Sequence, residues 1–582
     1  MTSIDSLPSR IRLTRVKLTT GPEIAIADGL TVIVGPNNVG KSALLRELFA
    51  GLVSEQNVFG PRDVFRSYEA QFSGTADDYI NSLGGYFARR PPGQYADGYY
   101  REDTFKLPSG ILPLSAIRTL WGSSDIGLGR FGQLFALYLD AANRLEMAHD
   151  APSCNLLGGE HPNSPVQHLY ASPALEERFS ALMERAFDMP ITVGRVSGNR
   201  ITLHVGSVDT PLTFPPTEKY IASLRSLPRL QEQGDGVRAF AGMLLSIITG
   251  RYGLIIIDEP EAFLHPAQAY LLGQLLAEQH VAGTQVVVAT HSADVIEGIT
   301  SVTTSQEVSV VRLTRKVKSN HVAQMHPDTV RRLYQEPLIR YYPILDGLFA
   351  QGVVVCEADS DCTYYRAVLE SCGAADGSLL PPGLGVHFTH CSGKARIARV
   401  MTLLGAARVP AACIVDIDIL QNVREFEGLI EACGMHPAEA VGYRNSIAQE
   451  LERDRVRVKR SVTKERAERI FSSSNSEFLA AGELRDLKAM LTPRSAWSEM
   501  KQDGTAKMGT EAACAFNTLD DLLRERGVFM VPCGELEGFH PDVSARSKSE
   551  WLRIVLEERR YMQSTRACEL LRGVTAFVAS RQ

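Results

Sequence analysis

Gly35-Pro36-Asn37-Asn38-Val39-Gly40-Lys41-Ser42 reads G-x-x-x-x-G-K-S, which is the spacing of a phosphate-binding loop. A β-branched run at residues 31–34 precedes it and a helix-favouring run at residues 43–48 follows it, as the motif requires. In such a loop backbone N–H groups surround the β-phosphate, Lys41 reaches the β- and γ-phosphate oxygens, and Ser42 offers a hydroxyl to Mg²⁺. The sequence therefore predicts nucleotide binding. The expected contacts are Gly35, Asn37, Asn38, Gly40, Lys41 and Ser42.

The composition is that of an ordinary globular protein. Hydrophobic residues make up 44% and charged residues 22% of the 582 residues. The 61 Lys and Arg residues against 67 Asp and Glu residues give a net charge of −6, which argues against coating nucleic acid by bulk charge. No apolar run approaches the roughly 20 residues that span a bilayer, residues 1–10 lack the core of a signal peptide, and the ten cysteines form no C-x-x-C pair. We therefore expect a cytoplasmic protein with free thiols and no membrane partner.

A second nucleotide motif lies at residues 254–260, an apolar strand that ends in Asp258, Glu259 and Pro260. In a phosphate-loop protein this is the Walker B arrangement, in which Asp258 orders Mg²⁺ and Glu259 polarises the attacking water. The alternative for such an acidic pair is a helix N-cap. A further buried strand at residues 285–289 leads to His291, which either contacts the γ-phosphate or caps the next helix.

Between the two motifs the pattern is less regular. Residues 86–114 are rich in Gly, Pro, Tyr and Arg, and are predicted as loop or irregular hairpin whose Tyr and Arg side chains either stack on bases or form an ordinary exposed excursion. Residues 111–118 are predicted as a strand and residues 131–147 as a helix. Gln133 is a candidate sensor of the γ-phosphate.

Acidic residues follow three predicted strands in the second half of the chain. Residues 352–356 lead to Glu357 and Asp361, and residues 411–415 lead to Asp416 and Asp418. Together with a strand at 386–389 and the intervening helices, these units indicate a parallel sheet with a site along its carboxyl edge.

The D-x-D pair indicates a metal. Residues two apart on a strand point the same way, so Asp416 and Asp418 are expected on one face. Two anions at about 4 Å repel by about 4 kcal/mol at an effective dielectric of about 20, and a divalent ion would relieve this repulsion. Residues 528–533 form another strand, followed by Glu535 and Glu537. Solvated acids at strand ends are the alternative explanation for each pair.

The segment Asp258-Glu259-Pro260-Glu261-Ala262-Phe263-Leu264-His265-Pro266, followed by Ala289-Thr290-His291-Ser292, resembles the ABC-type heads of the SMC, RecF-like and OLD (overcoming lysogenization defect) families. No sustained heptads separate Ser42 from Asp258, which argues against an SMC protein. The resemblance implies that ATP lies between two copies of the head, and that each phosphate loop faces the partner's signature segment. The candidate signature is Gln233-Gly234-Asp235-Gly236-Val237-Arg238, where Gly236 would contact nucleotide and Gly234 replaces the usual Ser, which puts efficient ATP hydrolysis in question.

The second half resembles a Toprim domain, in which a Glu after the first strand and a D-x-D after the third bind Mg²⁺. An ABC-type head followed by a Toprim domain is the OLD architecture. By that resemblance two metal ions, Mg²⁺ with Mn²⁺ as an alternative, would be held by Glu357, Asp361, Asp416, Asp418, Glu535 and Glu537. The family also uses a late lysine, for which we select Lys548 over Arg546 and Lys394.

The predicted fold class is thus α/β, an ABC-type P-loop ATPase head followed by a Toprim domain with a helical insertion. We expect the head at residues 1–345, with a long insertion before the signature segment, and the Toprim domain at 346–545, with its insertion at about 420–520. A C-terminal helical segment is expected at 546–582. Within the insertion a basic row from Arg453 to Arg466 either contacts DNA as an extended arm or is salt-bridged on a helix.

The resemblance implies an ATP-regulated, divalent-metal-dependent DNA endonuclease of the OLD type in phage defence. It would act on DNA as a homodimer or larger assembly through its ATPase heads, and a helicase-like or reverse-transcriptase protein is a candidate defence partner. The alternative is a non-nucleolytic ATPase for repair or sensing, whose Toprim-like domain binds DNA or a partner.

Overall fold

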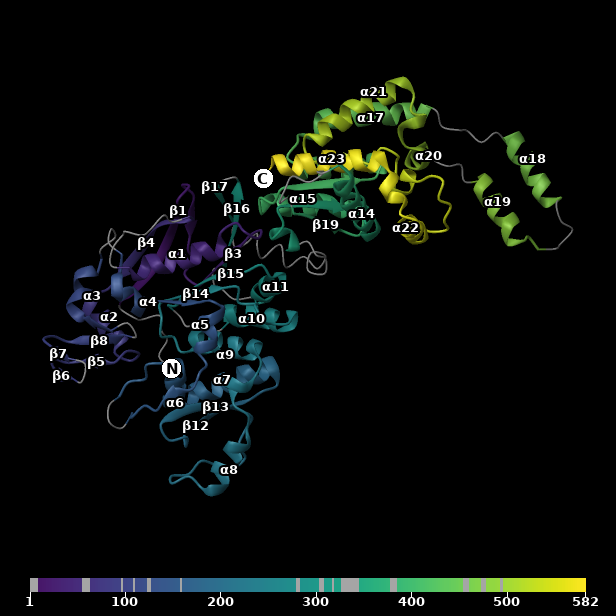
Figure 1. The fold of residues 1–582 in the computed structure, drawn as a ribbon. Helices are drawn as coiled ribbons and strands as arrows, with labels where there is room; N and C mark the ends of the chain where they lie inside the picture. The colour runs from purple at the N-terminus through teal and green to yellow at the C-terminus, as the bar shows by residue number, and fades with distance from the viewer. Residues whose placement is uncertain are drawn as a thin grey trace. The chain divides into compact units, whose positions relative to one another are not determined.

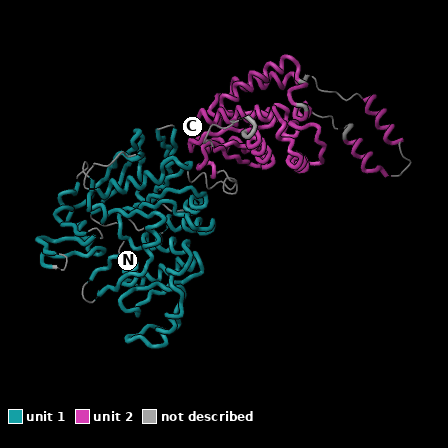
Figure 2. Tube along the Cα trace, in the orientation of Figure 1, with its two compact units in different colours: residues 1–340 teal, residues 341–582 magenta. Residues whose placement is uncertain are grey.

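The computed structural model divides into two compact units, residues 1–340 and 341–582 (Figure 2). No described helix combines the length and the apolar character that crossing a bilayer requires. The residues that the structure describes are 9–54, 63–95, 98–107, 110–122, 127–156, 160–278, 283–302, 308–316, 319–325, 345–376, 385–453, 460–472, 478–491 and 496–581.

Unit 1 is built around a six-stranded sheet in which five strands are parallel and the last is antiparallel (Figure 1). Its strands, in spatial order, are β10 (Ala136–Leu139), β14 (Leu254–Asp258), β15 (Gln285–Ala289), β3 (Leu30–Val34), β16 (Val308–Lys316) and β17 (Ser319–Met325). Strands β3 and β15 are buried along their whole length, as their Val and Ile content favours in a sheet covered on both faces. Ile33 pairs with Ala289, which pairs with Asp258, so these three strands end at one common edge.

The helices of unit 1 follow the strands as the two motifs predict. Helix α1 begins at Lys41, within the phosphate-loop motif, and α9 leads into β14. The described helices are α1 (Lys41–Val53), α2 (Ala76–Leu83), α3 (Leu114–Leu120), α4 (Gly132–Phe135), α5 (Ala141–Glu146), α6 (Pro165–Ala171), α7 (Pro173–Phe187), α8 (Glu218–Ser226), α9 (Asp235–Ile248), α10 (Pro266–Glu278) and α11 (Ala293–Ser301).

Smaller antiparallel sheets complete unit 1, and the segment at residues 86–114 forms short antiparallel pairs. The first sheet has the order β2 (Glu23–Ala25), β1 (Arg10–Leu18), β4 (Phe65–Ser73), and the second has the order β11 (Ala151–Pro152), β13 (Arg200–Val205), β12 (Ile191–Gly194). The short pairs are β5 (Arg89–Arg90) with β8 (Thr104–Leu107) and β9 (Gly110–Pro113), and β6 (Gly93–Tyr95) with β7 (Gly98–Tyr100).

Two sequence predictions in unit 1 are wrong. The strand predicted at 111–118 ends at Pro113, because Leu114 and Ile117, three residues apart, bury one face of helix α3. The helix predicted at 131–147 is interrupted by β10, which pairs in parallel with β14. Residues 136–139 are extended because they pair with β14. A partner strand so distant in the sequence cannot be predicted from local sequence.

Unit 2 contains a four-stranded, wholly parallel sheet (Figure 1). Its spatial order is β19 (Val386–His390), β18 (Gly352–Cys356), β20 (Ala411–Val415), β21 (Val528–Met530). The predicted fold class, an α/β ATPase head followed by a parallel-sheet Toprim domain, is confirmed. The described helices are α14 (Asp359–Asp376), α15 (Ile397–Ala406), α16 (Val423–Ala432), α17 (Pro437–Arg453), α18 (Arg460–Phe471), α19 (Ala481–Leu491), α20 (Ala496–Asp503), α21 (Thr510–Arg524), α22 (Lys548–Glu557) and α23 (Thr565–Ser580).

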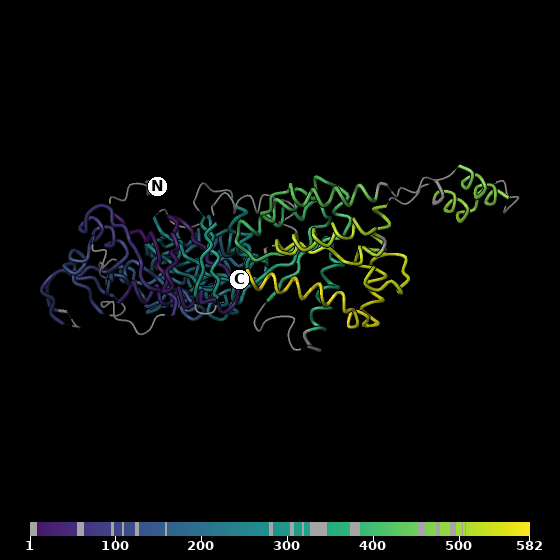
Figure 3. The backbone as a smooth tube through the Cα atoms, turned by 90° about the horizontal axis from the view of Figure 1, so that it is seen from above, coloured from purple at the N-terminus to yellow at the C-terminus, as the bar shows by residue number. Residues whose placement is uncertain are grey.

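The two C-terminal helices, α22 and α23, contribute side chains to the core of unit 2. Trp551 of α22 and Leu571 of α23 lie in one hydrophobic cluster with Val354 of β18, and Figure 3 shows the yellow C-terminal helix against the green part of this unit. Cys372 of α14 and Cys568 of α23 form a disulfide, so the expectation of free thiols is wrong for these two. The other eight cysteines are free, as expected.

The basic row of the insertion is only partly described, because residues 454–459 lie outside the described residues. Lys464 and Arg469 of α18 pair with Glu468 and Glu465 at helical spacing, as the salt-bridged alternative requires.

Candidate nucleotide and metal sites

The phosphate loop connects β3 to α1 and depends on two glycines. Gly35 has φ 145°, and a Cβ added to it would lie 2.0 Å from the carbonyl oxygen of Leu313. Gly40, with φ 96°, is the N-cap of α1, which begins at Lys41. The loop therefore turns tightly onto the positive end of a helix, where backbone N–H groups are free for phosphate. Asn37 and Asn38 are exposed at its tip.

The phosphate loop meets the Walker B strand directly. The Ser42 hydroxyl donates to Oδ1 of Asp258 at 3.1 Å, which brings together the two predicted Mg²⁺ ligands. Burial raises the pKa of Asp258, and the Ser42 hydrogen bond opposes that rise. The Lys41 ammonium is buried and donates to the carbonyl oxygens of Gly35 at 2.7 Å and Pro36 at 2.9 Å. Burial also lowers the pKa of Lys41. A phosphate anion at the loop would offer that ammonium a charged partner.

Glu259 directly follows Asp258 and has a half-exposed side chain. It has φ 47°, its backbone N–H donates to the Ala289 carbonyl at 2.8 Å, and its side chain is 49% exposed. A half-exposed carboxylate at the end of the Walker B strand can reach water, as the predicted role requires.

His291 lies beside Glu259 but is held by Glu261, which the sequence analysis did not select. Its backbone N–H donates to Oε1 of Glu261 at 2.8 Å, and its Nδ1 lies 3.1 Å from the same oxygen and 3.7 Å from Oε1 of Glu259. Glu261 is buried, and its Oε2 has no hydrogen-bond partner among the described residues. The third acid of the run Asp258-Glu259-Pro260-Glu261 was the available signal.

Arg144 of α5 is a further residue that sequence reasoning missed. It is fully buried, and its Nη1 donates to the carbonyl oxygens of Glu259 at 2.8 Å and Asp258 at 3.3 Å. A Cβ added to Gly242 of α9 would lie 1.8 Å from the Arg144 carbonyl oxygen, so the two helices touch there. Arg144 thus supports the main chain under both Walker B acids, and no local motif marks it.

The structure does not bring Gln133 to the nucleotide site. Gln133 lies in α4, before β10, and Ala136 of β10 pairs with Leu254 at the start of the Walker B strand. Because the two strands are parallel, Gln133 is at the amino end of the sheet, whereas Asp258 is at its carboxyl end. Its proposed contact with the γ-phosphate is not supported.

The signature segment forms the first turn of α9, with Gly234 as N-cap. A Cβ added to Gly236 would lie 2.5 Å from the carbonyl oxygen of Phe263, so this glycine packs on the chain that follows Walker B. A Cβ added to Gly234 would meet nothing within 4 Å. The space for a signature serine is therefore present although the serine is not.

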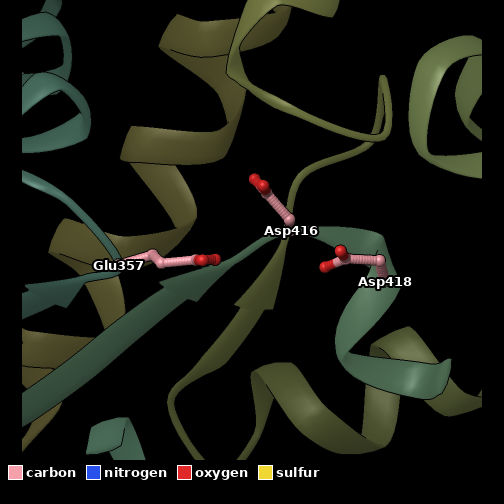
Figure 4. A group of neighbouring side chains, drawn as sticks. All are labelled: Glu357, Asp416 and Asp418. Carbon is pink, nitrogen blue, oxygen red and sulfur yellow. The ribbon is translucent and has the colours of Figure 1, made fainter. Parts of the chain in front are cut away.

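In unit 2 three of the predicted acids converge at the carboxyl edge of the sheet. Oxygen atoms of Glu357, Asp416 and Asp418 all lie within 4.8 Å of one another (Figure 4). Glu357 follows β18 and Asp416 follows β20. The reason differs from the predicted one: β20 ends at Val415, and a turn of 3-10 helix at Ile417–Gln421, not strand alternation, brings the D-x-D acids together.

The three-acid group fits a divalent cation. Oε2 of Glu357 and Oδ1 of Asp418 are buried and have no hydrogen-bond partner among the described residues. Burial raises the pKa of Asp416 to about 7, against the opposing effect of nearby lysines, and it also raises the pKa of Glu357. Carboxylate oxygens are the ligands that Mg²⁺ and Mn²⁺ prefer, and a cation would compensate these buried charges.

A lysine that the sequence analysis did not select lies among these acids. Nζ of Lys501, in α20 of the insertion, is 3.2 Å from Oδ2 of Asp416, 3.0 Å from Oδ2 of Asp418 and 3.9 Å from Oε2 of Glu535. The insertion therefore contributes directly to the site.

The selected lysine, Lys548, contacts a different acid. Its Nζ lies 2.8 Å from Oδ1 of Asp361, whose Oδ2 accepts from the Ala358 N–H at 2.9 Å at the start of α14. Asp361 thus has Oδ2 in a backbone hydrogen bond and Oδ1 in an ion pair with Lys548. Lys394, which was set aside, is 3.2 Å from Oδ2 of Asp418. The backbone N–H of Arg546 donates to Glu550.

The last acidic pair follows β21 after a short loop. Oε2 of Glu535 lies 3.9 Å from Nζ of Lys501, and burial raises the pKa of Glu535. Oε2 of Glu537 is buried without a hydrogen-bond partner among the described residues. Asp359, at 82% exposure, lies on the surface.

Comparison with known proteins finds a family match in each half of the chain. A family described as "AAA domain, putative AbiEii toxin, Type IV TA system" matches residues 219–297, which include the signature segment and Walker B. A family described as "Overcoming lysogenization defect protein-like, TOPRIM domain" matches residues 348–418, which include the three-acid group. A curated relative, the Old nuclease of Escherichia phage P2, is 23% identical over 172 residues. The match spans 29% of this chain and only 28% of that relative.

Among solved structures, an Smc head bound to the C-winged helix domain of ScpA is 12% identical, with a TM-score of 0.32, over 54% of this chain and 98% of that one. The SMC head domain from Thermotoga maritima is 15% identical, with a TM-score of 0.28, over 53% and 98%. These scores are low, so the fold assignment rests on strand order and motifs.

Fold and sites together define a P-loop ATPase joined to a TOPRIM domain. More particularly, the chain carries an AAA domain followed by a TOPRIM domain of the OLD-like type. The predicted resemblance to the OLD family is confirmed in these two domains.

Proposed function

We propose that the chain is an ATP-regulated, divalent-metal-dependent DNA endonuclease of the OLD type. The observation that supports this most is the group Glu357, Asp416 and Asp418, whose oxygens lie within 4.8 Å of one another at the edge of a parallel sheet. Buried carboxylates in that arrangement serve to hold Mg²⁺ or Mn²⁺, and such ions catalyse phosphodiester hydrolysis.

The charged residues of unit 2 would have different roles in this reaction. A bound divalent ion supplies an activated water and neutralises charge on the leaving oxygen. Glu357, Asp416 and Asp418 would hold it, with Glu535 and Glu537 as candidates for a second ion. Lys501 has charge and reach to bind a non-bridging phosphate oxygen once the acids are neutralised. Lys548 would hold the Asp361 side chain in place through their ion pair.

The nucleotide site would regulate this chemistry. Ser42 and Asp258 are already in contact and would hold Mg²⁺ beside the phosphates, while Glu259 faces the attacking water. We propose that ATP joins two copies of the head through the signature segment at Gly234, and that Gly236 and His291 contact the nucleotide there. Closure of the heads would then control access of DNA to the metal site.

Plasmid cleavage tests the nuclease proposal. Purified protein with Mg²⁺ or Mn²⁺ should nick or break plasmid DNA, and Asp416→Ala should abolish cleavage while leaving ATP binding unchanged. Asp359→Ala is the matched control, because that carboxylate follows Glu357 by two residues but is 82% exposed. Plasmid that stays intact at every metal and nucleotide concentration would refute a nuclease.

A second candidate is an ATPase whose TOPRIM domain binds DNA or a partner without cutting it. The observation that favours it is Lys501, whose ammonium forms ion pairs with both Asp416 and Asp418. The plasmid assay distinguishes this function from the nuclease. A protein that only binds DNA retards the plasmid in a gel but leaves it uncut.

We also propose a role in phage defence, in the cytoplasm, with a helicase-like or reverse-transcriptase protein as a candidate partner. Expression in a phage-sensitive host should lower plaque numbers, and Asp416→Ala should remove that protection.

A further inference from the structure

A polar cavity of about 530 Å³ lies in unit 2 beside the last strand of the sheet. The residues that matter to its chemistry come from four places, the turn after α20, the end of α21, the loop after β21 and the first turns of α23. They are Thr505, Arg524, Cys533, Arg566 and Glu569. Arg566 and Glu569 are exposed, so the cavity opens to solvent and a polymer can pass across its mouth.

Two chain segments lead from the three-acid group to this cavity. Cys533 precedes Glu535 by two residues, a path of at most about 7 Å of backbone. Lys501, which lies among the acids, is in α20, and Thr505 lies in the turn that follows this helix. The two segments touch, because a Cβ added to Gly534 would lie 2.1 Å from the Lys501 carbonyl oxygen. Cavity and acids therefore flank one short piece of backbone.

The charges in the cavity favour an anion. Arg524 is held in place: its Nε donates to Oδ2 of Asp520 at 2.6 Å, and its guanidinium lies 5.5 Å from the centre of the Phe529 ring. Arg566 has no salt-bridge partner among the described residues. Glu569 is the one acid among the lining residues. The Cys533 thiol is uncharged, since burial raises its pKa to about 12. Two guanidinium groups, one of them unpaired, offer the fork of donors that a phosphate oxyanion takes up.

We propose that this cavity binds a backbone phosphate of the DNA strand, next to the phosphodiester at the acidic group. The inference deepens the proposed function and rests on it for the position of the cleaved bond. A strand phosphate is favoured over a free phosphate, because the cavity is open and shares the Pro532–Glu535 backbone with the acids. Arg566 would be the principal contact, with the Thr505 hydroxyl and the fixed Arg524 beside it.

Fluorescence anisotropy with a labelled DNA duplex, in EDTA so that no cleavage occurs, tests the proposal on the full-length chain. Arg566→Glu should raise the Kd roughly tenfold, and Arg566→Ala should reduce the slope of log Kd against log salt by about one phosphate contact. Arg524→Lys keeps the positive charge but loses the paired N–H donors of the guanidinium, and should raise the Kd for DNA roughly threefold. The matched control is Arg553→Glu, an exposed arginine of α22 that does not line the cavity.

The outcomes separate this inference from the nuclease proposal. If wild type cleaves plasmid but Arg566→Glu binds DNA with unchanged Kd and salt slope, the phosphate site is refuted and the nuclease stands. If Arg566→Glu loses affinity and wild type never cleaves, the phosphate site stands without the nuclease. A third measurement uses millimolar inorganic phosphate in place of DNA. If phosphate binds to wild type but not to Arg566→Ala, while the two proteins bind DNA with the same Kd, the cavity is a free-phosphate site and the proposal is overturned.

Discussion

Nζ of Lys501 lies 3.0 Å from Oδ2 of Asp418, across a sequence separation of 83 residues. The helical insertion between β20 and β21 therefore returns a cation to the acids that would hold the metal. Its ammonium occupies the region in which a divalent ion would be bound, so lysine and metal compete for the same carboxylate oxygens.

The first prediction concerns that competition. Lys501→Met should bind Mn²⁺ more tightly, by roughly fivefold, because the acids lose their internal counter-charge. Titration followed by electron paramagnetic resonance of free Mn²⁺ measures this. Lys464→Met, a change at a 78% exposed site on α18, should leave the Mn²⁺ Kd unchanged. Weaker Mn²⁺ binding by Lys501→Met would show that the lysine supports the site instead of competing for it.

Gly234→Ser should raise ATP turnover. An added Cβ at Gly234 meets nothing within 4 Å, so the serine fits, and its hydroxyl is available to the γ-phosphate of a facing copy. We expect a severalfold rise in kcat that depends on protein concentration, since two copies must meet. Phosphate release across a concentration series measures it.

Gly236→Ser is the control for that change. Its Cβ would lie 2.5 Å from the Phe263 carbonyl oxygen, so this serine should lower turnover. Equal turnover of Gly234→Ser and wild type at all concentrations would contradict a signature role for the segment.

Glu261→Gln should slow ATP hydrolysis without weakening ATP binding. The carboxylate orients His291 by two contacts, at 2.8 Å to its N–H and 3.1 Å to Nδ1, and the neutral amide loses the charged one. We expect kcat to fall by about tenfold, which corresponds to a charged hydrogen bond of about 1.4 kcal/mol. Fluorescent nucleotide binding should change less than kcat does. Glu278→Gln, which removes a surface ion pair with Arg185, should change neither.

Lys41→Ala should change the ATP response of DNA cleavage while leaving the metal site intact. The ammonium is buried in the phosphate loop, and its loss leaves the phosphates without their cationic partner. Mn²⁺ binding should match wild type, whereas ATP should no longer alter the cleavage rate. An Mn²⁺ affinity that falls together with nucleotide binding would show that the variant is misfolded.

Acid should destabilise unit 1 through His168. Burial, assisted by the Arg251 guanidinium, lowers its pKa to about 4. Because the unfolded histidine takes up a proton near pH 6.5, the unfolded state binds more protons between about pH 4 and 6.5. Stability is therefore complete above that range and declines as the pH falls through it. Calorimetric melting at pH 5 and pH 7.5 should show this loss, and His168→Leu should reduce it. The control His161→Gln, at an exposed site, should melt like wild type at both values.

The sequence predicts well what local chemistry determines. The phosphate loop, Walker B and the acids after β18 and β20 are each a strand followed by reactive side chains, and they fold as expected. Prediction from the sequence fails where the conformation depends on pairing with a strand that is distant in the chain. Residues 136–139 become a strand only because β14 lies beside them, which also places Gln133 at the other end of the sheet. Lys501 and Arg144 reach their sites through tertiary packing, and nothing in their immediate sequence marks them.

The position of β21 at the edge of its sheet has a consequence for biosynthesis. Glu357, Asp416 and Asp418 leave the ribosome well before β21, Glu535 and Lys548 do, and the helices that complete the core, α22 and α23, come last. At about 5–20 residues per second, the nascent chain exposes unpaired acids for several seconds before the sheet closes. Unfinished chains therefore carry the three-acid group without Glu535, Lys548 and the helices that complete the core of unit 2.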